Sequence, residues 1–110
     1  MSAAIDLAVL HALRDATDAQ FLRELASTFL EEAPGMLRDL RESLGTQDAD
    51  RFRRAAHSLK SNALTFGAAS LGAQARALEL GGLPADGSSL DTLDMEFARV
   101  AAELGMLPDA

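Results

Sequence analysis

The sequence contains no cysteine, tryptophan or tyrosine, and its only aromatic residues are five phenylalanines. Without cysteine the chain forms no disulfide and has no thiol for catalysis or metal binding. With so few aromatic residues the core must be rich in leucine and alanine, which favours helices over sheets. No apolar run approaches the roughly 20 residues that a membrane span requires. Residues 1–5 lack the layout of a signal peptide, so we expect a cytoplasmic protein without membrane insertion.

Basic residues are also scarce: the chain has 10, against 17 acidic residues, and its formal net charge is −7. Such a protein is a poor binder of nucleic acid, because phosphate contacts need clustered lysine and arginine. The few basic residues are unevenly spread. Four of them lie within ten positions, namely Arg51, Arg53, Arg54 and Lys60, and the last is the only lysine in the chain. This local reversal of charge is the first indication of a site.

Apolar residues recur at helical spacing, and no stretch alternates as a strand would. We expect helices at about residues 5–14, 19–44, 48–66, 68–80 and 88–104. Pro34 interrupts the second of these, so two helices or one kinked helix could result. One kinked helix is favoured, because the apolar stripe keeps its phase across the proline. Gly45 and Gly67 are the expected C-terminal caps, and Ser88 with Asp91 is the expected N-terminal cap of the last helix.

Short connections between the four longer helices predict antiparallel neighbours. The expected fold is therefore all-α: an antiparallel up-down four-helix bundle with a short additional N-terminal helix capping one end. The 110 residues fit a single domain, with a core at about 5–104 and a tail at 105–110. We expect this domain to be a monomer. The third helix should bury one stripe, consisting of Phe52, Ala55, Ala56, Leu59, Ala63 and Phe66.

A helical wheel of the third segment places His57 about 140° from the centre of that stripe, on the solvent side. Basic residues surround the predicted position of the imidazole. Arg53 and Arg54 lie one turn before it, and Lys60 lies one turn after it. Ser61 follows on the same face, and Leu64 lies two turns on and also faces outward. The wheel thus predicts an exposed imidazole with basic, small and apolar neighbours.

This arrangement has the parts that phosphoryl carriage on histidine needs. Imidazole is mostly neutral at physiological pH and can then act as a nucleophile, and a nearby ammonium group favours the neutral form. Lys60 could reach the oxygens of an attached phosphoryl group. Ser61 is short enough to let a partner protein close over the ring, and Leu64 could supply apolar contact. Arg53 and Arg54 are further candidates for docking.

Plainer interpretations remain open at this point. A histidine on a helix surface is usually only a surface residue, and an arginine run at a helix start is usually a solvated face. We interpret His11, on the first segment, as such a surface residue. No metal site is expected, because zinc needs three or four converging ligands. The sequence also lacks a glycine-rich phosphate loop, and Gly81-Gly82 is interpreted as a helix stop.

The stretch Ala55-Ala56-His57-Ser58-Leu59-Lys60-Ser61, with Gly67 six residues later, resembles the signature of histidine-phosphotransfer (Hpt) domains. Residues 29–34 resemble the helix before the signature, and residues 71–79 the helix after it. The resemblance implies that His57 is the phosphorylated residue and that Lys60 stabilises the phosphoryl group. Ser61 stands where the family usually has glycine. Glu79 corresponds to a polar residue that the family often places near the imidazole.

The resemblance also implies partners. Receiver domains of response regulators, or of a hybrid histidine kinase, would supply the phosphorylated aspartate and Mg²⁺, and the chain itself would need no cofactor. The chain has no recognisable nucleotide site, so it would not be a kinase by itself. Two other interpretations stay open: a phospho-accepting module excised from a larger histidine kinase, and a helical adaptor in which His57 is inert. The initial methionine and the tail after Leu104 favour a free-standing protein.

Overall fold

The computed structural model describes residues 4–105, which form five helices and no strand. The helices are α1 (Leu7–Ala16), α2 (Ala19–Thr46), α3 (Ala49–Thr65), α4 (Ala69–Gly81) and α5 (Ser88–Gly105). The predicted all-α fold is therefore confirmed. Most of the predicted tail, residues 106–110, lies outside the described part of the chain. None of the five helices combines the length and the apolar character needed to cross a membrane.

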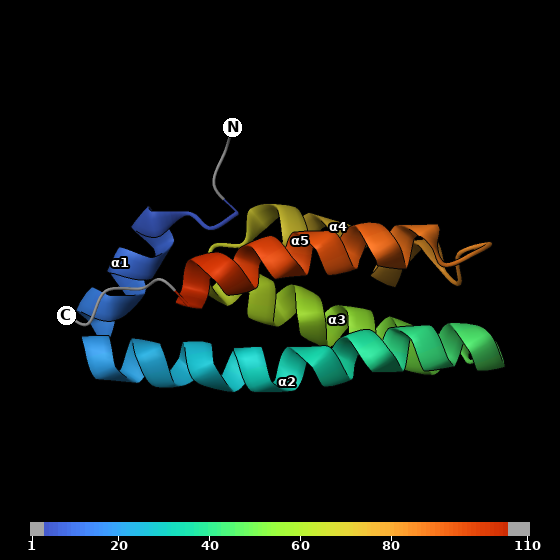
Figure 1. Ribbon diagram of the computed structural model, residues 1–110, viewed down its shortest axis with the longest axis horizontal. Helices are drawn as coiled ribbons and strands as arrows, with labels where there is room; N and C mark the ends of the chain where they lie inside the picture. Colours follow the sequence, from blue (N-terminus) through green and yellow to red (C-terminus); the bar gives the residue numbers. More distant parts are fainter. Residues whose placement is uncertain (1–3, 106–110) are drawn as a thin grey trace.

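The four long helices lie side by side along the length of the molecule (Figure 1). Followed by its colours, the chain runs out along α2, back along α3, out along α4 and back along α5 (Figure 1). The short α1 lies at one end, next to the beginning of α2. α3 packs against both α2 and α4, and α5 also contacts these two helices. The central position of α3 gives its exposed side chains a neighbouring helix on either side.

α2 is a single helix of 28 residues that continues through Pro34. A proline inside a helix removes one backbone hydrogen bond and is normally destabilising. Here Ala33 is fully buried, and Phe29 and Leu40 are buried on either side of the proline. Burial of these side chains holds both parts of the helix against the core. The prediction of one helix rather than two is confirmed.

Aspartates cap the beginnings of four helices. The carboxylates of Asp6, Asp18 and Asp48 each accept a hydrogen bond from a backbone N–H group in the first turn of α1, α2 and α3. Such a cap contributes about 1 kcal/mol. The prediction that Ser88 and Asp91 cap α5 is wrong, because Asp86 accepts the hydrogen bonds at the beginning of this helix. Its carboxylate accepts hydrogen bonds from the backbone N–H group and the hydroxyl group of Ser88, at 2.9 and 2.6 Å.

The end of α2 also differs from the prediction. Gly45 remains helical, and Gln47 adopts the left-handed conformation instead, with a φ of 59°. This conformation costs an ordinary residue about 1–2 kcal/mol. Two hydrogen bonds offset the cost: the side-chain amide of Gln47 donates to the carbonyl of Leu44 at 2.8 Å, and the N–H group of Asp48 donates to the carbonyl of Ser43 at 2.8 Å.

Leucine, alanine and phenylalanine side chains fill the core. Phe29 stacks on Phe66 with ring centroids 5.3 Å apart and meets the edge of Phe97 at 5.9 Å. In α1 the spacing Ile5, Val9, Leu13 predicts Val9 on the inner face, but the buried side chain is Leu10 and Val9 is half-buried. The predicted stripe of α3 is confirmed throughout, since all six of its members are buried: Phe52, Ala55, Ala56, Leu59, Ala63 and Phe66.

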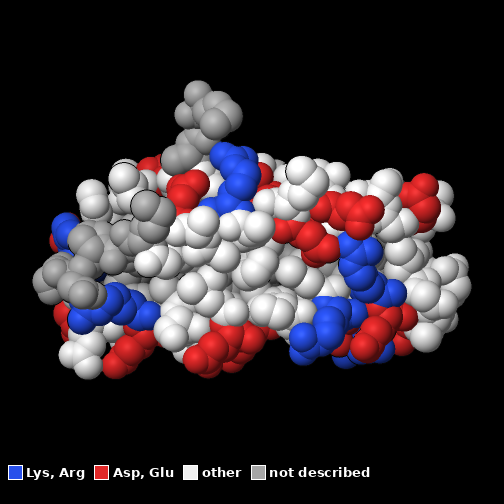
Figure 2. All heavy atoms as spheres, viewed as in Figure 1, with Lys and Arg blue, Asp and Glu red and all other residues white. Residues whose placement is uncertain are grey.

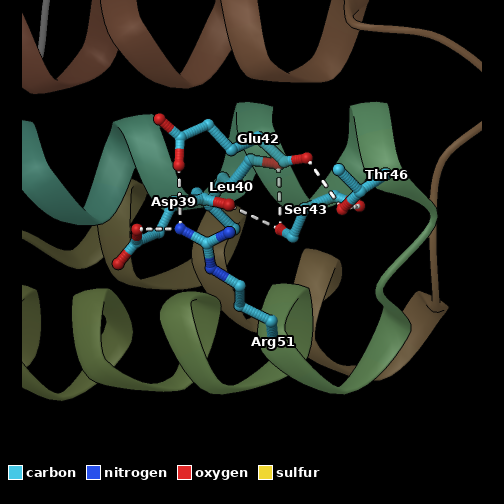
Figure 3. A network of polar contacts seen from close by, with 6 residues as sticks. All are labelled: Asp39, Leu40, Glu42, Ser43, Thr46 and Arg51. Atoms are coloured by element: carbon cyan, nitrogen blue, oxygen red, sulfur yellow. Dashed lines mark hydrogen bonds and ion pairs between the residues drawn. The ribbon is translucent and has the colours of Figure 1, made fainter.

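Ion pairs connect α2 to its neighbours. The guanidinium of Arg51, on α3, donates to Asp39 at 2.7 Å and to Glu42 at 2.8 Å, and both carboxylates lie on α2 (Figure 3). Arg41, on α2, bonds to Asp91 and Asp94 of α5 at 2.8 and 2.6 Å. On the face drawn in Figure 2, acidic and basic side chains accordingly lie next to one another rather than in separate patches. The scarce cations thus hold helices together.

The N-terminal segment is attached at two points. The N–H group of Asp6 donates to the carbonyl of Gly67, at the turn between α3 and α4, over 2.9 Å. The carboxylate of Glu103, on α5, accepts hydrogen bonds from the backbone N–H groups of Ala4 and Ile5, at 2.8 and 3.1 Å. Gly67 has a φ of 70°, and a Cβ atom there would lie 2.9 Å from the carbonyl oxygen of Asp6. A glycine is therefore required at this turn.

Replacing Gly67 by alanine should lower the free energy of unfolding by roughly 1–3 kcal/mol, through left-handed strain and displacement of the N-terminal segment. Gly45→Ala is the matched control, because a Cβ atom at Gly45 meets nothing within 4 Å. That variant should gain roughly 0.5–1 kcal/mol, as alanine favours the helix. Urea denaturation followed by circular dichroism measures both changes. Equal stability of the two variants would contradict the assignment.

Candidate functional site

His57 lies on α3, on the side opposite the buried stripe. Ala56 and Leu59, its neighbours on the core side, are completely buried, whereas the side chain of His57 is 55% exposed. The helix therefore holds the imidazole at the surface on a rigid support. This placement agrees with the helical wheel.

A carboxylate from the next helix holds the imidazole. Oε2 of Glu79, on α4, lies 2.6 Å from Nδ1 of His57, and its Oε1 accepts a hydrogen bond from Nζ of Lys60 at 2.7 Å. The side chain of Glu79 is only 12% exposed and that of Lys60 is 21% exposed. Glu79 thus bridges the two residues that the signature places one helical turn apart.

The charge of Glu79 fixes which ring nitrogen carries the hydrogen. Hydrogen bonds from Lys60 and His57 hold the pKa of Glu79 below its ordinary value, so the group is a carboxylate at neutral pH. A carboxylate only accepts hydrogen bonds, so the hydrogen in this contact belongs to Nδ1 of the imidazole. In the neutral ring, Nε2 then carries the free lone pair. In the neutral imidazole, the nitrogen with the free lone pair is therefore the one that does not contact Glu79.

The two arginines one turn before His57 share a single carboxylate. Asp50, in the first turn of α3, contacts Arg53 at 2.9 Å and Arg54 at 3.0 Å. A hydrogen bond from Arg53 and the charge of Arg54 hold the pKa of Asp50 below its ordinary value. All three side chains are more than half exposed. The pair therefore adds about one net positive charge beside His57.

Arg51 does not belong to the site, although the charge pattern of the sequence grouped it there. Its guanidinium is committed to Asp39 and Glu42 on α2. Lys60 is likewise bonded to Glu79. The local reversal of charge seen in the sequence is thus partly neutralised by Asp50 of α3 itself and partly by carboxylates of α2 and α4.

A groove runs between α2 and α3 beside the exposed face of α3. Its volume is about 320 Å³. Arg54 and Ser58, which lie within one turn of His57 on α3, form part of its wall. The complete lining is Met36, Asp39, Arg51, Arg54, Ala55 and Ser58. The groove is a concave surface that begins within one helical turn of His57.

Leu64 and Ser61 continue the exposed face of α3 beyond Lys60. Ser61 is exposed, and Leu64 is 54% exposed although it is apolar. Leu64 rests over Gly72 of α4, where an added Cβ atom would lie 2.8 Å from its Cδ2 atom. The missing side chain at Gly72 therefore lets Leu64 lie flat across α4, and its outer surface stays accessible.

Sequence reasoning missed Arg76. It lies one turn before Glu79 and one turn after Gly72, so helical periodicity places it on the same side of α4. It is exposed, and it forms no ion pair with any residue in the described part of the chain. A wheel of α4 drawn with Glu79 facing His57 would have identified it. The described residues provide no comparable surroundings for His11, and none of their His, Asp or Glu side chains form a metal-binding group of three.

Comparison with family models matches residues 24–103 to the Hpt domain. The match covers well over half of the chain and includes His57, Lys60 and Glu79. Comparisons with curated proteins and with solved structures gave no match.

The bridge formed by Glu79 should make stability depend on pH. Its lowered pKa means that the stabilisation is complete above about pH 4.5 and is lost as the pH falls through that lowered pKa. Glu79→Gln should therefore unfold at lower urea concentration than the wild type at pH 7, and this difference in urea midpoint should narrow as the pH falls below about 4.5.

Glu31→Gln provides the control for this measurement. Glu31 is an exposed carboxylate on α2 without an ion pair among the described residues, so its replacement should leave the urea midpoint unchanged at both pH values. The ionic bridge would be contradicted if the urea midpoints of Glu79→Gln and the wild type differed as much at pH 3 as at pH 7.

Proposed function

Because the chain belongs to the Hpt domain family, which transfers phosphoryl groups on histidine in two-component signalling, we propose that His57 is the residue that carries the phosphoryl group. A receiver domain donates the group from an aspartate, and another receiver domain accepts it from His57. The observation that carries this assignment is the 2.6 Å contact between Nδ1 of His57 and Glu79, on an imidazole that is 55% exposed.

In the loading step, the lone pair of Nε2 attacks phosphorus. A bond forms between Nε2 and phosphorus, the bond from phosphorus to the aspartate oxygen breaks, and the aspartate leaves as a carboxylate. The contact with Glu79 supports this step, because it keeps the hydrogen on Nδ1 and turns Nε2 outward. Catalysis then consists mainly of positioning and of charge neutralisation between the two proteins. In this proposal the receiver domain supplies the Mg²⁺.

Lys60 is proposed to stabilise the transferred group. The ammonium of Lys60 and the imidazole of His57 both bond to the carboxylate of Glu79. A phosphoryl group on Nε2 would place its oxygens near Lys60, and these oxygens carry more negative charge than the carboxylate. Charge-assisted hydrogen bonds to phosphoryl oxygens are among the stronger polar contacts. Lys60 can therefore neutralise charge that develops only when the phosphoryl group arrives.

Partner docking is assigned to the surface around His57. Arg53 and Arg54 provide a small excess of positive charge, Ser61 leaves room above the ring, and Leu64 supplies an exposed apolar contact. We propose that receiver domains of a hybrid histidine kinase and of a response regulator bind here in turn, in the cytoplasm, with the chain as a monomer. The groove between α2 and α3 adjoins this surface.

Replacing His57 by glutamine should abolish the uptake of acid-labile phosphate from a phosphorylated receiver domain while leaving the circular dichroism spectrum unchanged. His11→Gln is the matched control and should be phosphorylated like the wild type. A panel of receiver domains, each phosphorylated with acetyl phosphate, provides the donors. Undiminished uptake by the His57→Gln protein would refute the assignment.

Replacing Lys60 by methionine should slow the transfer from receiver domain to His57 by roughly tenfold or more, because a positive charge that stabilises the transition state is lost. Rapid-quench measurements with a receiver domain of that panel that loads the wild type give the rate. Arg38→Met removes an exposed arginine of α2 that has no ion pair within residues 4–105, and it should leave the rate unchanged. An equal effect of both variants would indicate general electrostatic attraction instead.

A further inference from the structure

The contact between His57 and Glu79 has a chemical consequence for the phosphorylated state. With Nδ1 bonded to Glu79, the phosphoryl group must reside on Nε2. A ring that keeps its hydrogen on Nδ1 and carries phosphorus on Nε2 is a cation, a phosphoimidazolium. A carboxylate 2.6 Å from Nδ1 stabilises that cation directly.

Resting on the proposed phosphorylation of His57, we propose that Glu79 retains the proton on Nδ1 after phosphorylation and so keeps the phosphoryl group transferable. Glu79 touches neither phosphorus nor the partner in this scheme. It is a positioning residue that acts through the imidazole.

The electron count explains why the proton matters. When the bond between Nε2 and phosphorus breaks, its electron pair returns to Nε2, and a bond forms between phosphorus and an oxygen of the accepting carboxylate. If Nδ1 carries its hydrogen, neutral imidazole leaves. If Nδ1 has lost its hydrogen, an imidazolate anion would have to leave, and it is a far poorer leaving group. A retained proton therefore permits transfer without any further proton movement.

Some of the charged groups around the ring stabilise its cationic form and others destabilise it. From α3, Lys60, Arg53 and Arg54 disfavour a cationic ring, although Asp50 offsets part of the charge of the two arginines. On α4, Arg76 lies one turn before Glu79, whereas Glu79 itself contacts the ring and favours its cationic form. On the side of α2, the groove holds the charges of Asp39 and Arg51, which are paired with each other.

Lys60 has a further effect through the same carboxylate. Its hydrogen bond to Oε1 lowers the proton affinity of Glu79, and the pKa of Glu79 is accordingly below its ordinary value. Glu79 therefore accepts a hydrogen bond from Nδ1 without taking the proton away. Lys60 thus keeps the proton from moving to Glu79, although its own charge opposes the cationic ring, and Glu79 is the group that stabilises the proton on Nδ1.

The test loads the protein with phosphoramidate, a small phosphoryl donor that needs no partner protein. After removal of the donor, ³¹P NMR follows the loss of phosphohistidine from pH 5 to pH 10. Loss is faster when the ring is protonated, so the rate falls with rising pH through a midpoint. Glu79→Gln should move this midpoint down by about one unit, which slows the loss on the alkaline side by up to roughly tenfold. Glutamine can still accept a hydrogen bond, so this variant tests the charge.

Two further variants control the measurement. Lys60→Met removes an ammonium while Glu79 keeps its contact with the ring, so the midpoint should move up, opposite in sign to Glu79→Gln. Glu31→Gln should leave the midpoint where the wild type has it. An unchanged or raised midpoint in Glu79→Gln would overturn the proposal while leaving phosphorylation of His57 intact. If neither phosphoramidate nor phosphorylated receivers load the wild type at His57, the proposed function fails and this inference fails with it.

Discussion

The site depends on one carboxylate that reaches from α4 to α3. Glu79 lies close enough to bond His57 and Lys60 together, because small residues line the contact between the two helices. Ala63 of α3 lies beside Gly72 of α4 and is completely buried, and Gly72 leaves room for Leu64. Larger residues would push the helices apart, and two hydrogen bonds of 2.6 and 2.7 Å do not tolerate such a shift. Packing between α3 and α4 therefore determines which ring nitrogen of His57 carries the hydrogen.

The helices were predictable because local spacing alone determines which side chains face the core. All six members of the α3 stripe are buried, as the helical period requires. The ends of helices were less predictable, because competing groups decide them. Gln47 rather than Gly45 adopts the left-handed conformation, since its own amide satisfies a carbonyl of α2. Asp86 replaces Ser88 as the cap of α5, since a carboxylate is the stronger acceptor.

The candidate site was predictable only along α3. The exposure of His57 and the position of Lys60 follow from the period of one helix. The pairing of Arg51 and Lys60 does not, because their carboxylates come from other helices: Asp39 from α2 and Glu79 from α4. Resemblance to a family suggested Glu79, but the sequence did not indicate that it would contact both residues. Arg51 is a second example. Its position among basic residues in the sequence suggested that it belongs to the site, but in the structure it pairs with carboxylates of α2 and connects two helices.

The sharing of Asp50 by Arg53 and Arg54 bears on how long a complex would last. A guanidinium that already has a carboxylate gains less from a second one, because part of the new attraction replaces an existing contact. Charges at the rim of an interface mainly speed the first encounter, whereas buried contacts govern release. Proteins that meet this surface should consequently separate quickly. Rapid separation would suit the proposed transfer from one partner to the next.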